Sequence, residues 1–206
     1  MKIYIVRHGE TDANKKGYVQ GWSNDPLNEN GHTLAEITGR GMRGIHFDCC
    51  ISSSLIRAKE TAEIILRESG NDVSIKIDDR LKEMNFGRFE GMSIKEENVV
   101  SFLKKPTVDY RFPGGESIAE VMERTQAFLK ELIAKDDDRT YLVSTHGCAL
   151  RSMLNYLYED PLDYWHGHVP YNCCVNILDV KDGAAALIAD DMIYYGQELV
   201  VDRYWE

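Results

Sequence analysis

The sequence has no long hydrophobic run and no excess of basic residues. Its apolar stretches all fall short of the roughly 18 residues that a membrane-spanning helix needs, and its start lacks the basic segment and long apolar stretch of a signal peptide. Lys and Arg total 24 against 34 Asp and Glu, which gives a net charge of −10. This charge argues against nucleic acid or an anionic membrane as the main partner. We expect a cytoplasmic protein that binds neither.

Cysteines are few and odd in number. The five are Cys49, Cys50, Cys148, Cys173 and Cys174. Such a count indicates buried, reduced thiols and not a disulfide framework. A zinc site built from His8, His146 and Cys148 would lack the close paired spacing of zinc motifs, and Arg7 beside His8 would repel a cation. We therefore expect no metal and no cofactor.

Short apolar segments alternate with amphipathic ones along the 206 residues. This alternation predicts a three-layer α/β/α sandwich with a mostly parallel central sheet and one antiparallel edge strand, in a single domain over residues 1–206. The expected strands are 3–6, 48–51, 73–77, 140–144, 173–180 and 184–189. The expected helices are 31–44, 54–68, 93–104, 118–135 and 149–158, with Ser117 as the N-cap of the fourth.

Three other segments complete the expected organisation. Residues 9–30 predict a polar loop, and residues 81–115 form a long excursion that is typical of a functional lid. The tail from residue 193 to residue 206 is rich in aromatic side chains. We expect it to pack against the body of the protein, with self-association as a homodimer as the alternative. Its aromatic residues are Tyr194, Tyr195, Tyr204 and Trp205.

An arginine and a histidine come directly after the first expected strand. The strand is apolar and β-branched, as is typical of a central parallel strand, and Arg7 and His8 follow it. Residues just past the carboxyl ends of such strands line the crevice where open α/β sheets bind ligands. Arg7 offers a planar fork of donors to phosphate oxygens, and the neutral imidazole of His8 is available as a nucleophile. The pair predicts a phosphate site, with an ordinary loop arginine and histidine as the alternative.

A second histidine occupies a second strand-to-helix turn. His146 follows the strand expected at 140–144, and Gly147 permits a tight backbone turn. The N-terminus of the helix that follows presents N–H groups and the positive end of its dipole, which suits an anion. His146 alone would be a structural turn residue, but it converges with His8 if the two strands are neighbours.

Arg57 stands at an unfavourable place for a cation. Three serines at 52–54 end the preceding strand and offer an N-cap for the helix expected at 54–68. Arg57 then falls in the first turn of that helix, where the dipole favours anions. This indicates that Arg57 has an anion to hold, with a surface arginine lying over apolar neighbours as the alternative.

Four sequence blocks carry a family resemblance. They are Arg7-His8-Gly9, the stretch from Ser53 to Ala62 around Arg57, the stretch 81–91 around Glu83, and His146-Gly147. In this order, from residue 2 to about residue 158, they resemble the histidine phosphatase superfamily, also called the phosphoglycerate mutase-like family.

The resemblance implies a role for each matching residue. His8 resembles the nucleophile that becomes phosphohistidine, and Glu83 holds the position of the proton donor to the leaving group. Arg7, Arg57 and His146 resemble the pocket that binds the phosphoryl oxygens. Glu83 must hold a proton when the ester bond breaks, so we expect its surroundings to favour that form. The remaining residues expected to bind phosphate or substrate are Asn14, Gln20, Gly21, Gly147 and Cys148.

Within this family the sequence resembles the phosphatase branch more than the mutases. Mutases of the cofactor-dependent type have a tryptophan where Ala13 stands, an arginine where Met84 stands, and paired arginines that have no counterpart in 96–111. The stretch 112–117 is similar to the phosphatase branch. We therefore expect a metal-independent phosphomonoester hydrolase that acts on a small phosphorylated metabolite.

Three alternatives remain open at this point. The first is a cofactor-dependent phosphoglycerate mutase, and the second is a specialised sugar-phosphate or ribazole-phosphate phosphatase. The third, from a different class, is a catalytically inactive phosphate-binding scaffold. Aromatic and histidine side chains are candidates to line an outer pocket for the rest of the substrate, with ordinary packing or a surface position as the alternative for each. These are Trp22, Tyr110, His166, His168 and Tyr171.

Overall fold

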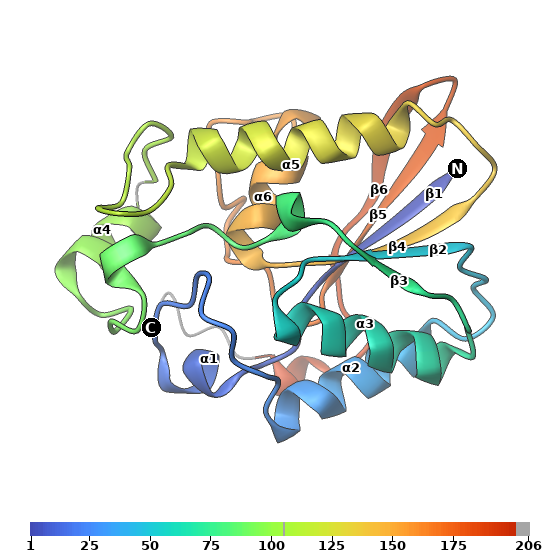
Figure 1. Cartoon of the computed structure of the whole chain (residues 1–206), viewed down its shortest axis with the longest axis horizontal. Coiled ribbons are helices and arrows are strands. Elements are labelled where there is room, and N and C mark those ends of the chain that lie inside the picture. Colours follow the sequence, from blue (N-terminus) through green and yellow to red (C-terminus); the bar gives the residue numbers. More distant parts are fainter. Residues whose placement is uncertain (105, 201–206) are drawn as a thin grey trace.

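A six-stranded sheet lies at the centre of the computed structural model, which describes residues 1–104 and 106–200 (Figure 1). The strands are β1 (Lys2–Arg7), β2 (Cys49–Ser52), β3 (Ile75–Ile77), β4 (Thr140–Thr145), β5 (Val175–Lys181) and β6 (Ala184–Met192). Their order in the sheet is β3-β2-β4-β1-β5-β6. The two strands that precede His8 and His146 are therefore neighbours, as the convergence of the two histidines requires.

Four of the strands run parallel and confirm the predicted fold class. β1 pairs with β4, β4 with β2 and β2 with β3 in parallel, whereas β5 is antiparallel to β1 and to β6. The expected antiparallel pairing lies at the sheet edge, where β5 and β6 form a hairpin. β5 lies one position inward, because the hairpin folds β6 back along it as the edge strand.

Helices cover both faces of the sheet. They are α1 (Asp12–Lys16), α2 (Glu29–Gly41), α3 (Ile56–Ser69), α4 (Glu97–Lys104), α5 (Ile118–Ile133) and α6 (Gly147–Leu154). Short 3₁₀ turns occupy 79–81, 87–89, 155–157 and 197–199. Figure 1 shows α5 and α6 above the sheet and α2 and α3 below it, which confirms the three layers.

Alternation along the strands builds a separate core on each face. In β1, Ile3 and Ile5 pack with α5 and α6, whereas Val6 packs with α3 on the other face. Each of these three side chains has no exposed surface. This period of two is that of a sheet buried on both sides, and it fixes which residues at the strand end turn toward which layer.

Two helices depart from the sequence-based expectation. The segment 9–30 was expected to be a polar loop, yet it contains α1, which begins with a capping box between Thr11 and Asn14. α5 is capped as predicted, by Ser117 in a second capping box. α3 is not capped by a serine: Leu55 is its N-cap residue, and Asn24 Oδ1 accepts a hydrogen bond from Ile56 N at 2.7 Å.

Two glycines permit the loop after β1 to touch the start of α2. A Cβ atom at Gly9 would lie 2.6 Å from the carbonyl oxygen of Gly31, and one at Gly31 would lie 2.1 Å from that of Glu10. Both distances are far below van der Waals contact. Glycine at both positions therefore holds the loop that carries His8 directly against α2.

The segment 81–115 lies at the end of the molecule opposite the N-terminus (Figure 1). Its core is apolar and aromatic: the ring of Phe112 lies 4.9–5.3 Å, centre to centre, from the rings of four neighbouring aromatic residues. These are Phe86, Phe89, Phe102 and Tyr110. Movement of this segment as a lid stays a prediction.

The described part of the aromatic tail packs on the body, as expected. The hydroxyl of Tyr195 donates to the carbonyl of Asn172 at 2.6 Å, and the ring of Tyr194 lies against Gly41 in α2. Tyr204 and Trp205 lie outside the described residues. Self-association stays a prediction.

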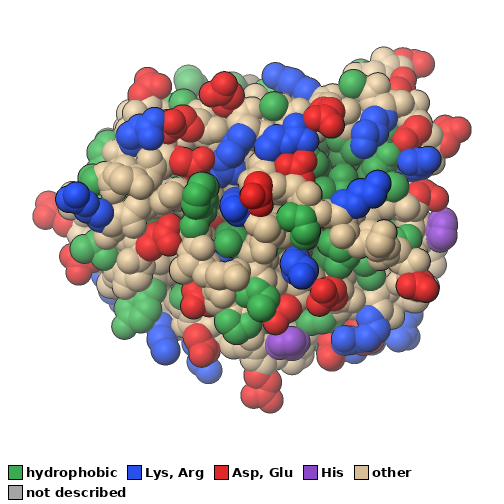
Figure 2. All heavy atoms as spheres, viewed as in Figure 1, with side chains coloured by type: hydrophobic (Ala, Val, Ile, Leu, Met, Phe, Trp, Pro, Cys, Tyr) green, Lys and Arg blue, Asp and Glu red, His purple; other side chains and the backbone are tan. Residues whose placement is uncertain are grey.

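Acidic and basic side chains are interspersed on the face of the molecule shown in Figure 2. In residues 1–104 and 106–200, no helix has the length and apolar character needed to cross a membrane. The expected lack of nucleic-acid and membrane partners stays a prediction.

Candidate active site

His8 is a buried, neutral imidazole with one ring nitrogen already engaged. Its side chain follows the carboxyl end of β1 and is 3% exposed. The Nδ1 atom lies 2.7 Å from the carbonyl oxygen of Gly9 and must donate to it, because a carbonyl has no hydrogen to give. Burial and the guanidinium groups of Arg57 and Arg7 hold the pKa of His8 well below its ordinary value of 6.5. The Nε2 lone pair is therefore left for attack.

Arg7 is fixed at the last position of β1. Its Nη1 atom donates to the carbonyl of Pro170, and the side chain is 5% exposed. A Cβ atom at Gly147 would lie 3.5 Å from Arg7 Nε and 3.7 Å from Glu83 Oε2, so both charged groups lie close to the backbone at the start of α6. The loop 170–172 thus orients Arg7 from one side, while the start of α6 limits it from the other.

His146 stands beside His8 and is oriented by a serine. The two ring centres are 5.1 Å apart, and His146 Nε2 lies 2.8 Å from Ser53 Oγ. Ser53 Oγ already accepts from the N–H of Leu55 at 3.3 Å, so its own hydrogen is available to His146 Nε2. In that arrangement Nδ1 carries the proton of His146, and this buried atom has no hydrogen-bond partner among the described residues. Burial and Arg57 hold the pKa of His146 well below 6.5.

Arg57 is fully buried behind His8 and keeps its charge. Its Nη1 and Nη2 atoms donate to the carbonyls of Ser23 and Gly21 at 2.6 and 2.7 Å. Burial lowers the pKa of Arg57 to about 10, which leaves it protonated at neutral pH. Its contacts hold the loop 21–23, and its charge acts on both histidines.

Glu83 meets three backbone N–H groups. Its Oε1 atom accepts from Met84 and Ala149 at 2.7 and 3.0 Å, and Oε2 accepts from Cys148 at 3.2 Å. The start of α6 was expected to offer its N–H groups to an anion, and here that anion is the Glu83 carboxylate. All three partners are donors, and a protonated Glu83 stays a prediction.

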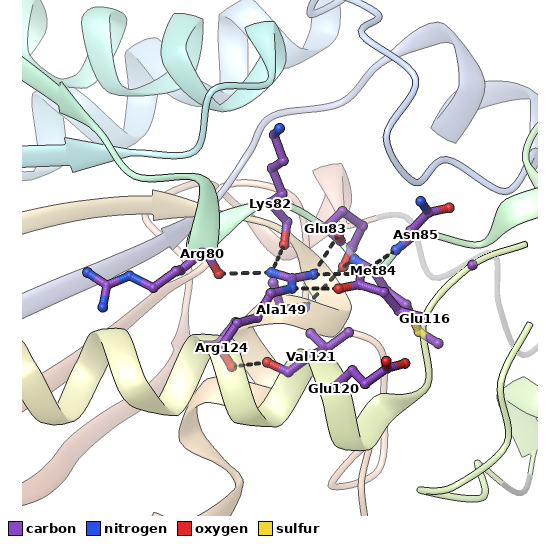
Figure 3. A network of polar contacts seen from close by, with 12 residues as sticks. Arg80, Lys82, Glu83, Met84, Asn85, Glu116, Glu120, Val121, Arg124 and Ala149 are labelled. Carbon is purple, nitrogen blue, oxygen red and sulfur yellow. Dashed lines mark hydrogen bonds and ion pairs between the residues drawn. The ribbon is translucent and has the colours of Figure 1, made fainter.

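An arginine on α5 holds the backbone around Glu83 in place (Figure 3). Arg124 donates to the carbonyls of Arg80, Lys82 and Glu83 at 2.7–2.9 Å. The same guanidinium pairs with Glu116, whose Oε2 atom accepts from the N–H of Asn85 at 2.8 Å. Two side chains, Arg124 and Glu116, thus hold four backbone groups of the turn that carries Glu83.

A cavity of about 550 Å³, open solvent at its mouth included, joins these groups to a second set of residues. We call its polar part the floor; it consists of Arg7, His8, Asn14, Gln20, Glu83, Gly147 and Cys148. We call its apolar part the roof; it comes from residues 18–19, from 165 and 169, and from the 86–103 segment. The structure thus brings seven of the ten expected site residues into one lining.

Three expected site residues lie behind this lining. Arg57 and His146 are fully buried next to His8, and Gly21 accepts from Arg57. A Cβ atom at Gly21 would lie 2.3 Å from Glu90 Oε1 and 2.7 Å from the carbonyl of Met84. Gly21 is therefore required by close packing of the loop.

Cys148 lines the floor as an inert thiol. Burial and the charge of Glu83 raise its pKa well above the ordinary value. A thiol that keeps its proton is a poor nucleophile and a poor metal ligand. Among the described residues, no three His, Cys, Asp or Glu side chains come together as metal ligands. Chemistry without a metal stays a prediction.

The outer pocket is built from other residues than those expected, so that expectation is wrong. Trp22 donates to the carbonyl of Glu83, and Tyr110 packs on Phe112. His166 stacks on Tyr158, and His168 stacks on Tyr171. None of the five expected residues is in the cavity lining that the described chain provides.

Several supporting residues carry no local sequence signal. Asn172 donates to the carbonyl of His8 at 3.0 Å, and Glu90 accepts from the N–H groups of Trp22 and Ser23. In each of these contacts the partner lies 67 or more residues away in the chain. The apolar spacing of Val99, Phe102 and Leu103 on α4 was visible in the sequence, but nothing there placed it over His8.

The carboxyl ends of the parallel strands bring a histidine and an arginine together, an arrangement suited to phosphate in an α/β protein. A model of the histidine phosphatase superfamily (branch 1) matches residues 3–189. The chain therefore belongs to the histidine phosphatase superfamily, whose enzymes are phosphatases and mutases. This confirms the resemblance drawn from the four sequence blocks.

Some individual relatives are named as mutases and others as phosphatases. A probable phosphoglycerate mutase GpmB of Salmonella choleraesuis is 33% identical over 187 residues, which cover 88% of this chain and 86% of the relative. The solved structure of Bacillus stearothermophilus YhfR is 27% identical, with a TM-score of 0.84 and coverage of 93% of this chain and 97% of that one. A putative alpha-ribazole-5′-P phosphatase from Escherichia coli is 26% identical, with a TM-score of 0.78 and coverage of 91% and 94%.

Proposed function

We propose that this protein hydrolyses phosphomonoesters through a phosphohistidine formed on His8. One observation carries the proposal: the neutral imidazole of His8 lines the cavity with Nδ1 bonded to Gly9, so that Nε2 keeps its lone pair. Arg7 in the same lining supplies positive charge for the phosphoryl oxygens. Phosphoryl transfer depends mostly on such positioning and charge neutralisation.

In the first half-reaction, His8 Nε2 attacks phosphorus while the bond between phosphorus and the ester oxygen breaks. The leaving oxygen takes a proton from Glu83, since an alkoxide is a poor leaving group. A phosphate dianion that enters beside Glu83 repels its negative charge and so favours the protonated carboxyl at this stage. His146 Nδ1–H and Arg57 add a donor and a charge behind the transferring group.

In the second half-reaction, water attacks the phosphorus of phospho-His8. Glu83 takes the proton from this water, the bond between phosphorus and nitrogen breaks, and inorganic phosphate leaves with His8 restored. The three N–H groups that surround the Glu83 carboxylate hold its two oxygens in place beside the floor of the cavity. No metal takes part in either half-reaction of this scheme.

Mutase activity is the second candidate, because the relative that is 33% identical is named a probable phosphoglycerate mutase. A mutase must hold a bisphosphate while the phosphoryl group moves, and this needs cations for a second phosphate. Among the described residues, Arg7 is the one cationic side chain in the cavity lining. This shortage favours loss of the phosphoryl group to water.

The experiment measures phosphate release from a panel of phosphomonoesters in EDTA, for the native protein and for His8→Ala. The panel includes 3-phosphoglycerate with 2,3-bisphosphoglycerate, with formation of 2-phosphoglycerate followed in parallel. We expect release that survives EDTA and disappears in the variant, together with an acid-labile phosphoprotein in the native protein alone. Formation of 2-phosphoglycerate faster than phosphate release would favour the mutase. Absence of phosphate release from every ester would favour a phosphate-binding scaffold.

A further inference from the structure

The roof of the cavity consists of large apolar side chains that face unfilled space. Residues buried as deeply as these usually pack against other side chains at close to crystal density. Here they pack against one another on one side and line a cavity on the other, which is the usual form of a site for an apolar ligand group. The members on which the argument depends are Val19, Phe86, Val99, Phe102, Leu103 and Trp165, each 4–8% exposed.

Three distant segments supply this roof. Val19 comes from the loop after α1, and Trp165 comes from the loop after α6. Between them, α4 presents Val99, Phe102 and Leu103 on one face, at the spacing of one helical turn. The apolar character is thus common to the whole roof and is not a feature of one element.

Charge is confined to the floor. In the part of the chain that the structure describes, the lining contains Arg7, His8 and Glu83 but no lysine and no other arginine. Arg7 is taken by the phosphoryl group. A carboxylate or second phosphate elsewhere on the substrate would therefore meet the roof without a partner cation, and buried unpaired charge is strongly unfavourable.

We propose that the leaving group of the substrate is uncharged and apolar, an alkyl or aryl group that fills the roof. The inference rests on the proposed phosphohistidine chemistry and names the substrate class of the same site. The part of the substrate beyond the ester oxygen enters the space under α4 and Trp165, while the phosphoryl group lies on the floor.

A matched series of esters tests this. We would measure kcat/KM for n-alkyl phosphates from ethyl to hexyl, which share one leaving-group chemistry, and we expect a rise of about three- to fourfold per methylene until the roof is filled. The second comparison uses 3-methylbutyl phosphate and 3-phosphooxypropanoate, which have similar shapes but differ by a carboxylate. We expect the apolar ester to be preferred by about 100-fold.

Two variants of α4 connect the preference to the roof. Val99→Lys introduces a cation on the inner face and should raise kcat/KM for 3-phosphooxypropanoate by about 10-fold while lowering it for the alkyl ester. Ser101→Lys adds the same charge on the exposed face of α4 and should leave both values unchanged. If Val99→Lys does not fold, Val99→Ala enlarges the cavity and should move the optimum of the alkyl series to a longer chain.

The outcomes separate this inference from the proposed function. Two results would overturn the apolar leaving group: kcat/KM that does not change with alkyl chain length, or a preference for the carboxylate ester. If phosphate release still depends on His8 in these cases, the proposed hydrolase is unaffected. Loss of His8-dependent release from every ester would overturn both. A chain-length optimum that does not move in the folded Val99 variants would show that the roof does not select the substrate.

Discussion

The floor and the roof of the cavity are built by different forces. Each chemical group of the floor is held by directed hydrogen bonds: His8 by Gly9, Arg7 by Pro170, and Glu83 by three N–H groups. The roof is held by contacts between apolar and aromatic side chains. Hydrogen bonds fix angles and tautomers, whereas apolar contacts fix volume and tolerate exchange of similar side chains. The floor is therefore specified for one reaction, and the roof can be altered for different substrates.

The largest expected effect is at the floor. Glu83→Gln keeps the shape of the side chain but cannot donate or accept the proton, so kcat for alkyl phosphates should fall by about 10²–10⁴-fold. The loss should be much smaller in the first half-reaction of 4-nitrophenyl phosphate, whose leaving group needs no proton. Pre-steady-state release of nitrophenol measures that step directly.

Glu96→Gln serves as the matched control, because Glu96 is exposed in the same segment of the chain. Equal losses for alkyl and nitrophenyl esters in Glu83→Gln would contradict the role of proton donor and would indicate a role in holding the floor together.

The next effect concerns the support of the floor. Arg124→Gln removes the donors to three carbonyls and the partner of Glu116, a pair whose side chains are each 18% exposed. We expect the free energy of unfolding to fall by about 2–3 kcal/mol, with kcat lowered more than KM is changed. Denaturant unfolding and steady-state kinetics measure the two quantities.

Arg124→Lys should recover part of the stability, since it keeps the charge but not the fork of donors. A variant with lower stability and unchanged kcat would show that Arg124 does not position Glu83.

The two histidines predict how stability depends on pH. Their pKa values in the folded protein lie well below 6.5, so the unfolded chain binds more protons as pH falls below about 6.5. The free energy of unfolding should then fall by about 1.4 kcal/mol per pH unit for each histidine, until the folded pKa is reached. Denaturant unfolding between pH 7.5 and about pH 5 measures this slope.

His8→Gln should remove one of the two contributions to this slope. The exposed His32 is the control position, where His32→Gln should leave the slope as it is. A slope that is identical in all three proteins would mean that carboxylates, and not the buried imidazoles, control the acid sensitivity.

The smallest expected effect is in the aromatic cluster that supports the roof. Phe112→Leu removes ring contacts at the centre of the aromatic cluster without touching the cavity, and should cost about 1–2 kcal/mol. Because the roof is held by such contacts, amide hydrogen exchange should rise in α4 and remain unchanged in β1 and β4. Faster exchange throughout the sheet would show that the roof and the floor unfold as one unit.

The floor could be predicted from the sequence far better than the roof. Arg7, His8 and His146 each follow an apolar strand, and Glu83 lies in a block with a family pattern, so local signals were sufficient. The three serines at 52–54 were expected to supply the N-cap of α3, but Asn24 takes that place from 32 residues away, and Ser53 bonds to His146. The roof depends on where α4 and Trp165 come to lie after folding, and no local periodicity carries that information.

The position of β1 in the sheet also determines when the site is assembled. Its two neighbours are β4 and β5, which occupy residues 140–145 and 175–181. β1, which His8 directly follows, is therefore synthesised well before both of its partner strands. Topologies with such distant pairings have a high contact order and fold slowly, and an unpaired apolar strand is prone to aggregation meanwhile. We expect nascent chains that end before residue 140 to lack a paired β1, so that the active site is among the last parts of the molecule to form.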